Sequence, residues 1–431
     1  MTPGNAPHSE DQLAAAAPWH RRLPWVPIAI SIAVIAAGAF AVAPIRDAAT
    51  GGAVVEAVLE RPAGYVVIAP VSNVFDTLTL ISARQHIALL AGVIALFIAW
   101  RIWKGRAGAT ASSHLLAVAA LLLAILAVYA AGALIPRPMA ALATSNPTII
   151  TVDFHSHTDA SHDGRQTLEA NRRWHARAGF DAAYITDHGS VAGAERALAT
   201  NPPTAAQGGG VVLLQGIEVT WNGEHVGILG AERTYRGLLT ENKRDVDAEA
   251  LRLASLIPGG EPVVIWHHPR SMDRLRAYAA PDTAGVSAIE IVNGAPKDID
   301  YIRDNHAAIM QYAEQHDLAL ASGTDNHGWG YAAPGWTLMR LPQWRGMRPD
   351  SLAGRIERVL RIGGFGSTLV AERRVASPGG SDIQLALSVV AIPWRMLTTL
   401  SNEERVAWLA WIWGIAAAAW WARGRRRRAA T

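Results

Sequence analysis

Long apolar runs occupy both ends of this 431-residue chain, and a mixed apolar and polar pattern fills the region between them. Three runs near the N-terminus and one near the C-terminus each have about the length that a helix needs to cross a bilayer. These runs are residues 24–45, 86–103, 115–135 and 406–422. The pattern predicts an integral membrane protein with four spanning helices.

Two shorter features of the apolar pattern need an interpretation of their own. Ala41-Val42-Ala43 resembles a cleavage site, so a cleaved signal peptide is the alternative for residues 24–45. The further apolar runs downstream favour a retained helix. A short apolar run, 383–392, is ended by Pro393, and we expect it to lie at the membrane interface or against the other helices.

Basic residues flank the long runs at matching ends. Arg21 and Arg22 precede the first run, Arg101 and Lys104 follow the second, and the arginines of 423–428 follow the fourth. If the spans alternate in direction, all three clusters fall on one face, which the positive-inside rule assigns to the cytoplasm. We therefore expect an inner- or plasma-membrane protein with both termini in the cytoplasm and with the region between the third and fourth spans outside it.

The central region alternates short apolar stretches, typical of strands, with longer helical patterns. This alternation predicts β–α units that form a parallel sheet or barrel. The division is an N-terminal membrane region (1–145), a sheet domain (146–376) and a C-terminal interfacial and membrane segment (377–431). Strands are expected at 148–154, 182–186, 211–217, 263–266, 287–292 and 318–323, with helices at positions such as 165–178, 245–256 and 299–316.

Metal-capable side chains follow each of the six predicted strands. Because the carboxyl ends of barrel strands converge on one face, we expect a shared site there. Imidazoles and carboxylates together suit Zn, Mn or Fe. His162 lies beside Asp163, and either can be the ligand. In strand order, the candidates are His155, His157 and Asp163; Asp187 and His188; Glu218 and His225; His267 and His268; Glu290 and Asn293; Asp325 and His327.

Composition and charge narrow the classes of function. The chain has no cysteine, which excludes disulfides, thiolate metal sites and a cysteine nucleophile. The formal net charge is +3, but residues 150–376 hold 23 lysines and arginines against 27 aspartates and glutamates, a balance of −4. The basic excess therefore lies at the membrane ends, and the broad positive footprint of a duplex nucleic-acid binder is absent.

Five motifs of the central region resemble, in order, those of the PHP (polymerase and histidinol phosphatase) domain family. They are 155-HSHTDASHDG-164, 186-TDH-188, 216-GIE-218 with His225 following, His268-Pro269 and 323-GTDNH-327. The resemblance covers roughly 150–376 and implies a distorted (β/α)7 barrel that binds up to three divalent ions and hydrolyses phosphate mono- or diesters. The transmembrane flanks lie outside it.

The resemblance also implies a ligand set, in which Glu218 bridges two ions. Asp163 is favoured over His162 because members of the family place the ligand just before this glycine. One ion would be held by His155, His157, Glu218 and Asp325, a second by Asp163, His188 and His327, and a third by Glu218, His225 and His268.

A metal-bound water, with a pKa of ~7 in place of ~15.7, is the expected nucleophile for phosphate-ester hydrolysis. Asp163 and Glu218 are therefore expected to act in catalysis, and Arg270 can bind the phosphate or lie on the surface. We expect Asp153 and Asp187 to orient ligand imidazoles and His267 to line the pocket or the core. We expect His175, His306 and His316 to lie on helix surfaces.

Two other classes of function compete with a phosphoesterase. A metal-dependent amidohydrolase usually needs a carbamylated lysine at a strand end, whereas Lys243 and Lys297 lie elsewhere. A membrane-anchored metal- or ligand-sensing module would tolerate lost ligands, and none is lost. The expected partners are the lipid bilayer and a phosphorylated substrate whose identity, like the oligomeric state, the sequence leaves open.

Overall fold

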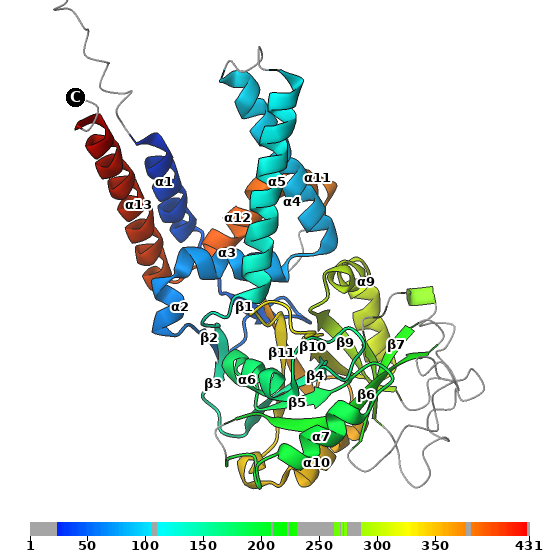
Figure 1. The fold of residues 1–431 in the computed structure, drawn as a ribbon. Helices are drawn as coiled ribbons and strands as arrows, with labels where there is room; N and C mark the ends of the chain where they lie inside the picture. The colour runs from blue at the N-terminus through cyan, green and yellow to red at the C-terminus, as the bar shows by residue number, and fades with distance from the viewer. Residues whose placement is uncertain are drawn as a thin grey trace, which may run out of the picture.

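The computed structural model describes residues 24–104, 110–207, 210–221, 224–230, 263–267, 269, 271–273, 286–375 and 381–428. These residues form two stacked parts (Figure 1): a layer of helices from both ends of the chain stands on a sheet domain built from the residues between them. The predicted helix at 245–256 lies outside the described residues.

The helical layer contains two pairs of long helices. Helix α1 (Trp25–Ala39) lies beside α13 (Asn402–Arg428), and α4 (Ala83–Trp103) pairs with α5 (Ala111–Leu134) (Figure 1). Helices α4 and α5 are long and apolar enough to cross a membrane; α1, with 15 residues, is shorter, and α13 is not in this set. Two of the four predicted spans thus meet the test of length and composition.

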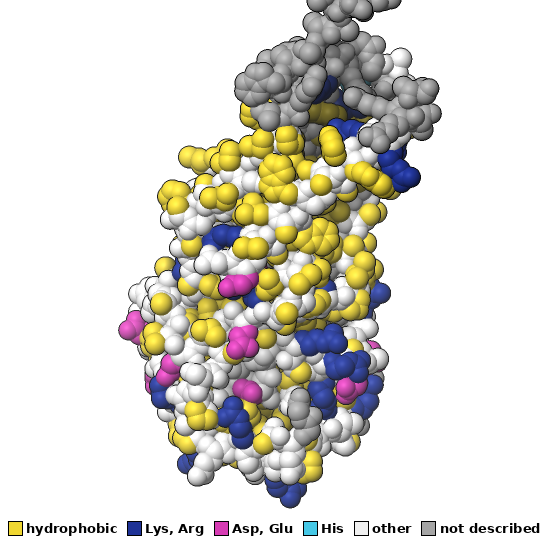
Figure 2. Space-filling view, turned by 90° about the vertical axis from the view of Figure 1, so that its left-hand side faces the viewer, with side chains coloured by type: hydrophobic (Ala, Val, Ile, Leu, Met, Phe, Trp, Pro, Cys, Tyr) yellow, Lys and Arg dark blue, Asp and Glu magenta, His cyan; other side chains and the backbone are white. Residues whose placement is uncertain are grey.

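Exposed apolar side chains cover much of the helical layer (Figure 2). Helix α5 buries only Gly132, and α4 buries only Gln85 and Arg101, so most of their apolar side chains face outward. A soluble monomer rarely exposes so large an apolar surface, whereas a bilayer solvates it. Exposed large apolar residues of this pair include Ile87, Leu96, Trp103, Leu115, Leu116, Leu123 and Leu126.

Short helices connect the two parts: α2 (Ala63–Val67), α3 (Ala69–Leu80), α11 (Asp382–Ala386) and α12 (Ser388–Thr398). The apolar run 383–392 was expected at the membrane interface or against the other helices; its helix α12 packs against α1, α3 and α4, and it continues through Pro393. A proline removes only one backbone donor, and the packing of α12 on α1, α3 and α4 keeps the helix intact.

The sheet has ten strands in the order β1-β12-β11-β4-β5-β6-β7-β8-β9-β10. The six predicted strands correspond to β4, β5, β6, β8, β9 and β10. Parallel pairing holds within β4-β5-β6 and β8-β9-β10, but β7 is antiparallel to both of its neighbours, as are β11 and β12 to theirs. The bounds are β1 (Ile45–Asp47), β4 (Ile149–Ser156), β5 (Ala182–Ile185), β6 (Val212–Trp221), β7 (Glu224–Leu229), β8 (Val263–His267), β9 (Val286–Asn293), β10 (Ala319–Gly323), β11 (Gly335–Arg340) and β12 (Thr368–Arg373).

The sheet curls until its last strand approaches its middle. Just beyond β10, the amide of Asp325 donates to the carbonyl of His155 (2.9 Å), and the amide of His157 donates to the carbonyl of Asn326 (3.1 Å). Because β10 makes no continuous ladder with β4 or β11 in the described backbone, the sheet is a curled half-barrel. A closed (β/α)7 barrel is not formed by these ladders.

Helices cover the outer face of the half-barrel, and the core lies between them and the strands. All eight residues of β4 are buried, as expected for a strand covered on both faces. Helix α6 begins at the Thr167 cap and ends at Gly179, whose φ of 87° is left-handed. The covering helices are α6 (Leu168–Ala178), α7 (Ala192–Thr200), α9 (Pro296–Gln315) and α10 (Pro349–Gly363), with a 3₁₀ turn at Trp344–Gly346.

A buried network of charges joins the two parts of the molecule. Asp76 of α3 accepts from Arg137 (3.0 Å), Arg373 (3.2 Å) and the Tyr65 hydroxyl (2.8 Å). We call Asp76, Arg137, Arg373 and Tyr65 the junction network. Residues from the predicted membrane region also enter the lower part, because β1 pairs with β12, and β2 (Ala57–Glu60) pairs with β3 (Ala141–Thr144).

Candidate metal centre

The metal-capable side chains gather where the central strands end. His155 lies near the end of β4 with His157 just beyond it, and Glu218, His225 and His267 come from β6, β7 and β8. His188 follows β5 and pairs through its backbone with Glu218. Asp325 and His327 follow β10, so segments far apart in sequence meet at one rim of the half-barrel.

Glu218 lies at the centre of the cluster. Its carboxylate oxygens are 2.6 Å from Nδ1 of His225, 3.1 Å from Nε2 of His155, 3.1 Å from Nδ1 of His188 and 3.4 Å from Nε2 of His157. The carboxylate is almost fully buried, at 1% exposure. One carboxylate in reach of four imidazoles has the position that a bridging ligand requires.

Two further carboxylates complete the rim. Oδ1 of Asp325 lies 3.1 Å from Nε2 of His157, 3.4 Å from Nε2 of His155 and 3.3 Å from Nδ1 of His327. Oδ2 of Asp163 lies 3.3 Å from His327 and 3.5 Å from His188. The structure therefore brings together the eight described members of the predicted ligand set. His268 and Arg270 lie outside the described residues.

The choice between Asp163 and His162 follows from these contacts. Asp163 faces two ligands of the cluster, and its Oδ1 accepts from the Ser161 hydroxyl at 2.7 Å. His162 is half exposed; its Nε2 lies 3.7 Å from Asp163, and its ring lies 5.2 Å from that of His188, centroid to centroid. The geometry favours Asp163 as the ligand of this loop.

His267, which the sequence pattern assigned to the pocket wall or core, lies inside the cluster. Its ring stacks on that of His155 with centroids 3.8 Å apart, and its Nδ1 is 3.7 Å from Glu218. His267 is the register partner of His225 across β7 and β8. A side chain at Gly227 would put its Cβ 2.3 Å from Nε2 of His267, so glycine makes room for the ring. Successive side chains of a strand point to opposite faces, so His267 lies on the same face of β8 as Val263 and Ile265.

The residue that orients a ligand imidazole is Glu290. Its Oε1 lies 3.0 Å from Nδ1 of His155, and its Oε2 accepts from Asn293. This contact leaves Nε2 of His155 directed at Glu218, as ligand histidines require. Gly323 is essential to the approach, because a Cβ there would lie 2.1 Å from Oε1 of Glu290.

Asp153 and Asp187 do not fill the roles expected of them. Asp153 binds His175 (2.7 Å) and Thr324, and Asp187 accepts from the amide and hydroxyl of Thr158. Both carboxylates thus fix the backbone that carries the ligands, and neither contacts a ligand imidazole within the described part of the chain. The prediction that His175 lies on a helix surface is wrong. The side chain is fully buried, and its Nε2 lies 2.7 Å from a carboxylate oxygen of Asp153.

The site is strongly polarised. Burial would lower the pKa of His155, but the carboxylates of Glu218, Asp325 and Glu290 raise it well above its usual value. Burial would likewise raise the pKa of Glu218, and the imidazoles led by His155 and His188 hold it well below its usual range. Asp325 behaves in the same way, since His155, His157 and His327 lower its pKa. These carboxylates are therefore ionised acceptors at neutral pH.

The pKa values of the imidazoles shift in opposite directions, depending on whether burial or a neighbouring carboxylate dominates. Burial, with His327 nearby, lowers the pKa of His157 to about 3, and burial with His155 nearby lowers that of His267. For His327, Asp163 and Asp325 outweigh burial and raise the pKa to about 9. His157 and His267 are therefore neutral, which is the form that binds metals.

The donor set fits divalent metal ions. Four groups of three side chains each bring one ligand atom per residue within 4.8 Å of the others. Both ring nitrogens of His157 and of His267 are buried without a hydrogen bond in the described part of the chain, a costly state that a bound ion would relieve. The groups are His157, His188 and His327; His155, His157 and Asp325; His155, Glu218 and His267; His188, Glu218 and His225.

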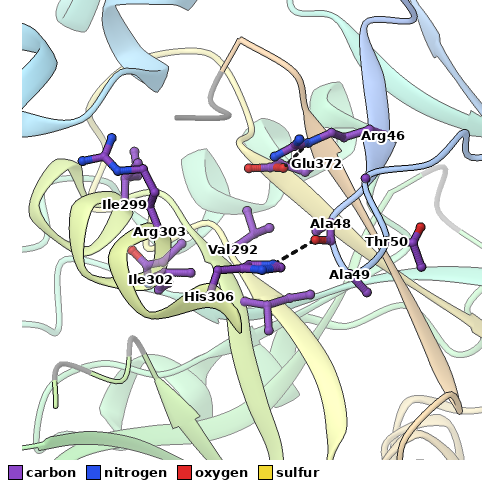
Figure 3. A pocket seen from close by; sticks show the side chains of 13 residues that line it. Arg46, Ala48, Ala49, Thr50, Val292, Ile299, Ile302, Arg303, His306 and Glu372 are labelled. Carbon is purple, nitrogen blue, oxygen red and sulfur yellow. Dashed lines mark hydrogen bonds and ion pairs between the residues drawn. The ribbon is translucent and has the colours of Figure 1, made fainter. Parts of the chain in front are cut away.

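A second cavity, of about 310 Å³, lies between β9, α9 and the turn after β1 (Figure 3). Its charged groups already have protein partners: Arg46 binds Glu372 at 2.8 Å, Arg303 binds Asp300, and Nε2 of His306 meets the carbonyl of Ala48 at 3.0 Å. His306 is therefore held against the neighbouring turn and is only half-buried. Unlike the metal centre, this cavity has balanced charges.

No protein-family model and no curated protein matches the sequence. The solved structures similar to the chain include PsfC from Pseudomonas syringae (17% identity, TM-score 0.34, covering 59% of this chain and 100% of that one). A candidate metal-dependent phosphoesterase from Bifidobacterium adolescentis has 18% identity and a TM-score of 0.32, over 49% of this chain and 96% of that one. An amidohydrolase from Chromobacterium violaceum has 19% identity and a TM-score of 0.31, over 46% and 98%.

Proposed function

We propose that this chain is a membrane-anchored, metal-dependent phosphoesterase of the PHP type. The observation that carries the proposal is the convergence of six described histidines with Glu218, Asp325 and Asp163, in which the buried nitrogens of His157 and His267 have no hydrogen bond. Such a centre is suited to two or three divalent ions, with Zn, Mn or Fe favoured by its nitrogen content.

Divalent ions bound there would supply the acidity that turns water into a hydroxide nucleophile at neutral pH and the positive charge that neutralises phosphoryl oxygens. The chain itself holds the geometry. Glu218 fixes the spacing of the imidazoles around it, and Glu290 locks the orientation of His155. Asp163, the most exposed carboxylate of the cluster, lies at the solvent side, where it can position the attacking water.

The proposed activity can be tested on the full chain in detergent. The protein is stripped with a chelator and assayed on p-nitrophenyl phosphate and bis-p-nitrophenyl phosphate, before and after adding Mn or Zn. Metal-restored turnover of either ester supports the proposal, and the preferred ester separates phosphatase from phosphodiesterase. Bound metal without turnover of either ester contradicts it and favours a sensing module, and metal-dependent turnover of amides alone favours an amidohydrolase.

We propose also that the sheet domain faces away from the cytoplasm. The start of α1, the end of α4, the start of α5 and the end of α13 lie at the end of the helical layer remote from the sheet (Figure 1). Arg101, Lys104 and Arg423 lie at or near this end, which the positive-inside rule assigns to the cytoplasm. A reporter enzyme fused after residue 145 is expected to act as an exported one, and cytoplasmic activity there would reverse the topology.

A further inference from the structure

The metal centre opens into a cavity that it shares with the helical layer. This cavity has a volume of about 440 Å³, within the ~300–1,000 Å³ range of ligand pockets. At one end its wall contains Asp163, Asp325 and His327 of the metal centre. At the other end it contains residues of three helices: Phe75, Leu78 and Thr79 of α3, His86 of α4, and Tyr129, Gly132 and Ala133 of α5.

The helix end of the cavity lies at the ends of α4 and α5 that are nearest the sheet domain. Helix α4 begins at Ala83 and α5 ends at Leu134, so His86 and Ala133 are both within the turn of helix nearest the sheet domain. The hydroxyl of Tyr129 meets Nδ1 of His86 at 2.7 Å and ties the two helices together there. Beyond this level the outward surface of the pair is apolar.

The loop that follows His327 docks on these helices. The amide of Gly330 donates to the carbonyl of Ala133 at 3.0 Å, and the carbonyl of Gly330 accepts from the Trp174 indole. Gly330 has a φ of 77°, and a Cβ there would lie 2.6 Å from Thr79. The last metal ligand and the inner ends of α3 and α5 are thus parts of one wall.

The rim of the cavity has the chemistry of a membrane interface. Trp329 lines the cavity, is 50% exposed, and carries the guanidinium of Arg165 at 4.1 Å from its ring. Tryptophan and arginine are favoured at lipid headgroups, where an apolar body meets an anionic surface. Apolar side chains make up most of the wall between this rim and the metal centre.

We infer that the substrate is a lipid phosphoester, whose phosphate lies at the metal centre while its hydrocarbon chain lies along the cavity wall formed by α3, α4 and α5. A soluble phosphoester would use only the polar end of this cavity. A hydrocarbon chain uses the whole of it, and its far end can remain in the bilayer. The inference rests on the proposed phosphoesterase function and adds its substrate class.

The test compares two esters that differ only in chain length, using the full-length protein in phosphatidylcholine nanodiscs with Mn. For a diesterase these are methyl and hexadecyl p-nitrophenyl phosphate, and for a monoesterase they are propyl and hexadecyl phosphate. We expect a higher kcat/KM for the hexadecyl ester. We expect Ala133→Trp, and independently Leu78→Trp, to lower the hexadecyl-to-short-chain ratio roughly tenfold, the effect of withdrawing about two methylenes from an apolar contact.

Leu123→Trp is the matched control, because Leu123 is 67% exposed on the same helix and does not line the cavity. The ratio in this variant should stay within about twofold of the parent, as for an ordinary surface substitution. Partition of the long ester into the bilayer is the same for all variants. An equal ratio in the parent, both cavity variants and the control therefore overturns the inference, even if the short ester is hydrolysed.

Absence of metal-dependent turnover of both esters contradicts instead the proposed function itself. A fall in the ratio for Ala133→Trp and Leu78→Trp with no change for Leu123→Trp supports the lipid substrate. Metal content and melting temperature, measured on each variant, show whether it retains its fold.

Discussion

The molecule contains two buried clusters of charge, and they are built in opposite ways. In the junction network the carboxylate of Asp76 meets two guanidinium groups and a phenol, so both of its oxygens are bound. In the metal centre, buried histidines outnumber the carboxylates, and the nitrogens of His157 and His267 have no hydrogen bond among the described residues. In the first cluster protein groups bind both carboxylate oxygens, although Nε of Arg137 and Nη1 of Arg373 are buried without a hydrogen bond among the described residues. In the second, imidazole nitrogens without a hydrogen bond lie beside carboxylates, in a donor set that fits a metal ion.

The difference between the two clusters indicates which buried charges stabilise the fold and which bind a ligand. A buried polar group without a partner costs free energy, so a protein keeps several such groups together only where something else satisfies them. A paired cluster joins structural elements and is expected to matter for stability. A cluster in which several imidazoles converge on shared carboxylates is expected to matter for binding. Four experiments with five substitutions follow, ordered from the largest expected effect to the smallest.

The largest effect is expected from removing a member of the metal centre. His155→Ala and Asp325→Ala should each reduce phosphoester hydrolysis to the level of the chelated protein, because each removes a proposed metal ligand. His155 lies near three carboxylates, and Asp325 lies near three imidazoles. Both variants should still fold, but the metal-free His155→Ala protein should melt below the parent, because Glu218 and Glu290 lose the imidazole that lies between them. Full activity in either variant would contradict the assignment of the site.

Next comes removal of Asp76 from the junction network. Asp76→Ala leaves Arg137 and Arg373 buried without their acceptor, and breaking a buried pair costs about 3–5 kcal/mol. The melting temperature in detergent should fall accordingly. The control is Asp159→Ala, since the pair of Asp159 with Arg196 is 2.6 Å long but exposed and such a pair contributes about 1 kcal/mol or less. Equal losses in the two variants would contradict the expected contribution of the junction network to stability.

A smaller effect is expected from the residue that orients His155. Glu290→Gln keeps the shape of the side chain but removes its charge, and loss of such a partner typically costs about 10–100-fold in metal affinity or activity. Titration of the chelated protein with Zn should show the weaker affinity. Unchanged affinity would mean that Glu290 supports the fold and not the ligand.

The smallest effect concerns a carboxylate that belongs to neither cluster. Burial raises the pKa of Asp181 from 3.8 to about 6, although the amide of Thr151 donates to it. Its contribution to stability is therefore present below pH ~4 and lost as the pH rises through about 6. Asp181→Asn should raise stability at pH 8 by about 1–2 kcal/mol, a discounted share of the shift.

At pH 4 the same variant should melt close to the parent, because Asp181 is then protonated in the folded state and, with its ordinary pKa of 3.8, about half protonated in the unfolded state. Melting curves of both proteins at pH 4 and pH 8 measure this difference. A variant that is stabilised equally at the two pH values would show that the charge of Asp181 is not the cause.

Much of the lower part of the molecule could be predicted from the sequence. The strands β4, β5, β6, β8, β9 and β10 are apolar enough to stand out, and their order along the chain places the ligands at one rim. Antiparallel β7 was missed, because a six-residue strand that pairs through a hairpin has little pattern of its own. His225 was identified only by its distance from Glu218.

The join between the two parts could not be predicted. Helix α3 buries Ser72, Asn73, Asp76 and Thr77, a polar face that in a sequence suggests exposure to solvent. Its partners, such as Glu404 and Arg373, lie about 300 residues away along the chain, and only the folded molecule brings them together. The same reason explains His175, whose acceptor Asp153 lies on another element.

The hydrogen bond from the amide of Gly330 to the carbonyl of Ala133 joins the loop after His327 directly to helix α5, so this helix does more than hold the sheet domain at the membrane. A membrane helix that serves only as an attachment can be removed without changing the active site of the domain that it carries. Here the hairpin of α4 and α5 supplies a wall of the chamber next to the metal ligands. A sheet domain produced without these helices would lack one wall of the cavity. The unit that carries the proposed function therefore includes α4 and α5 as well as the sheet domain.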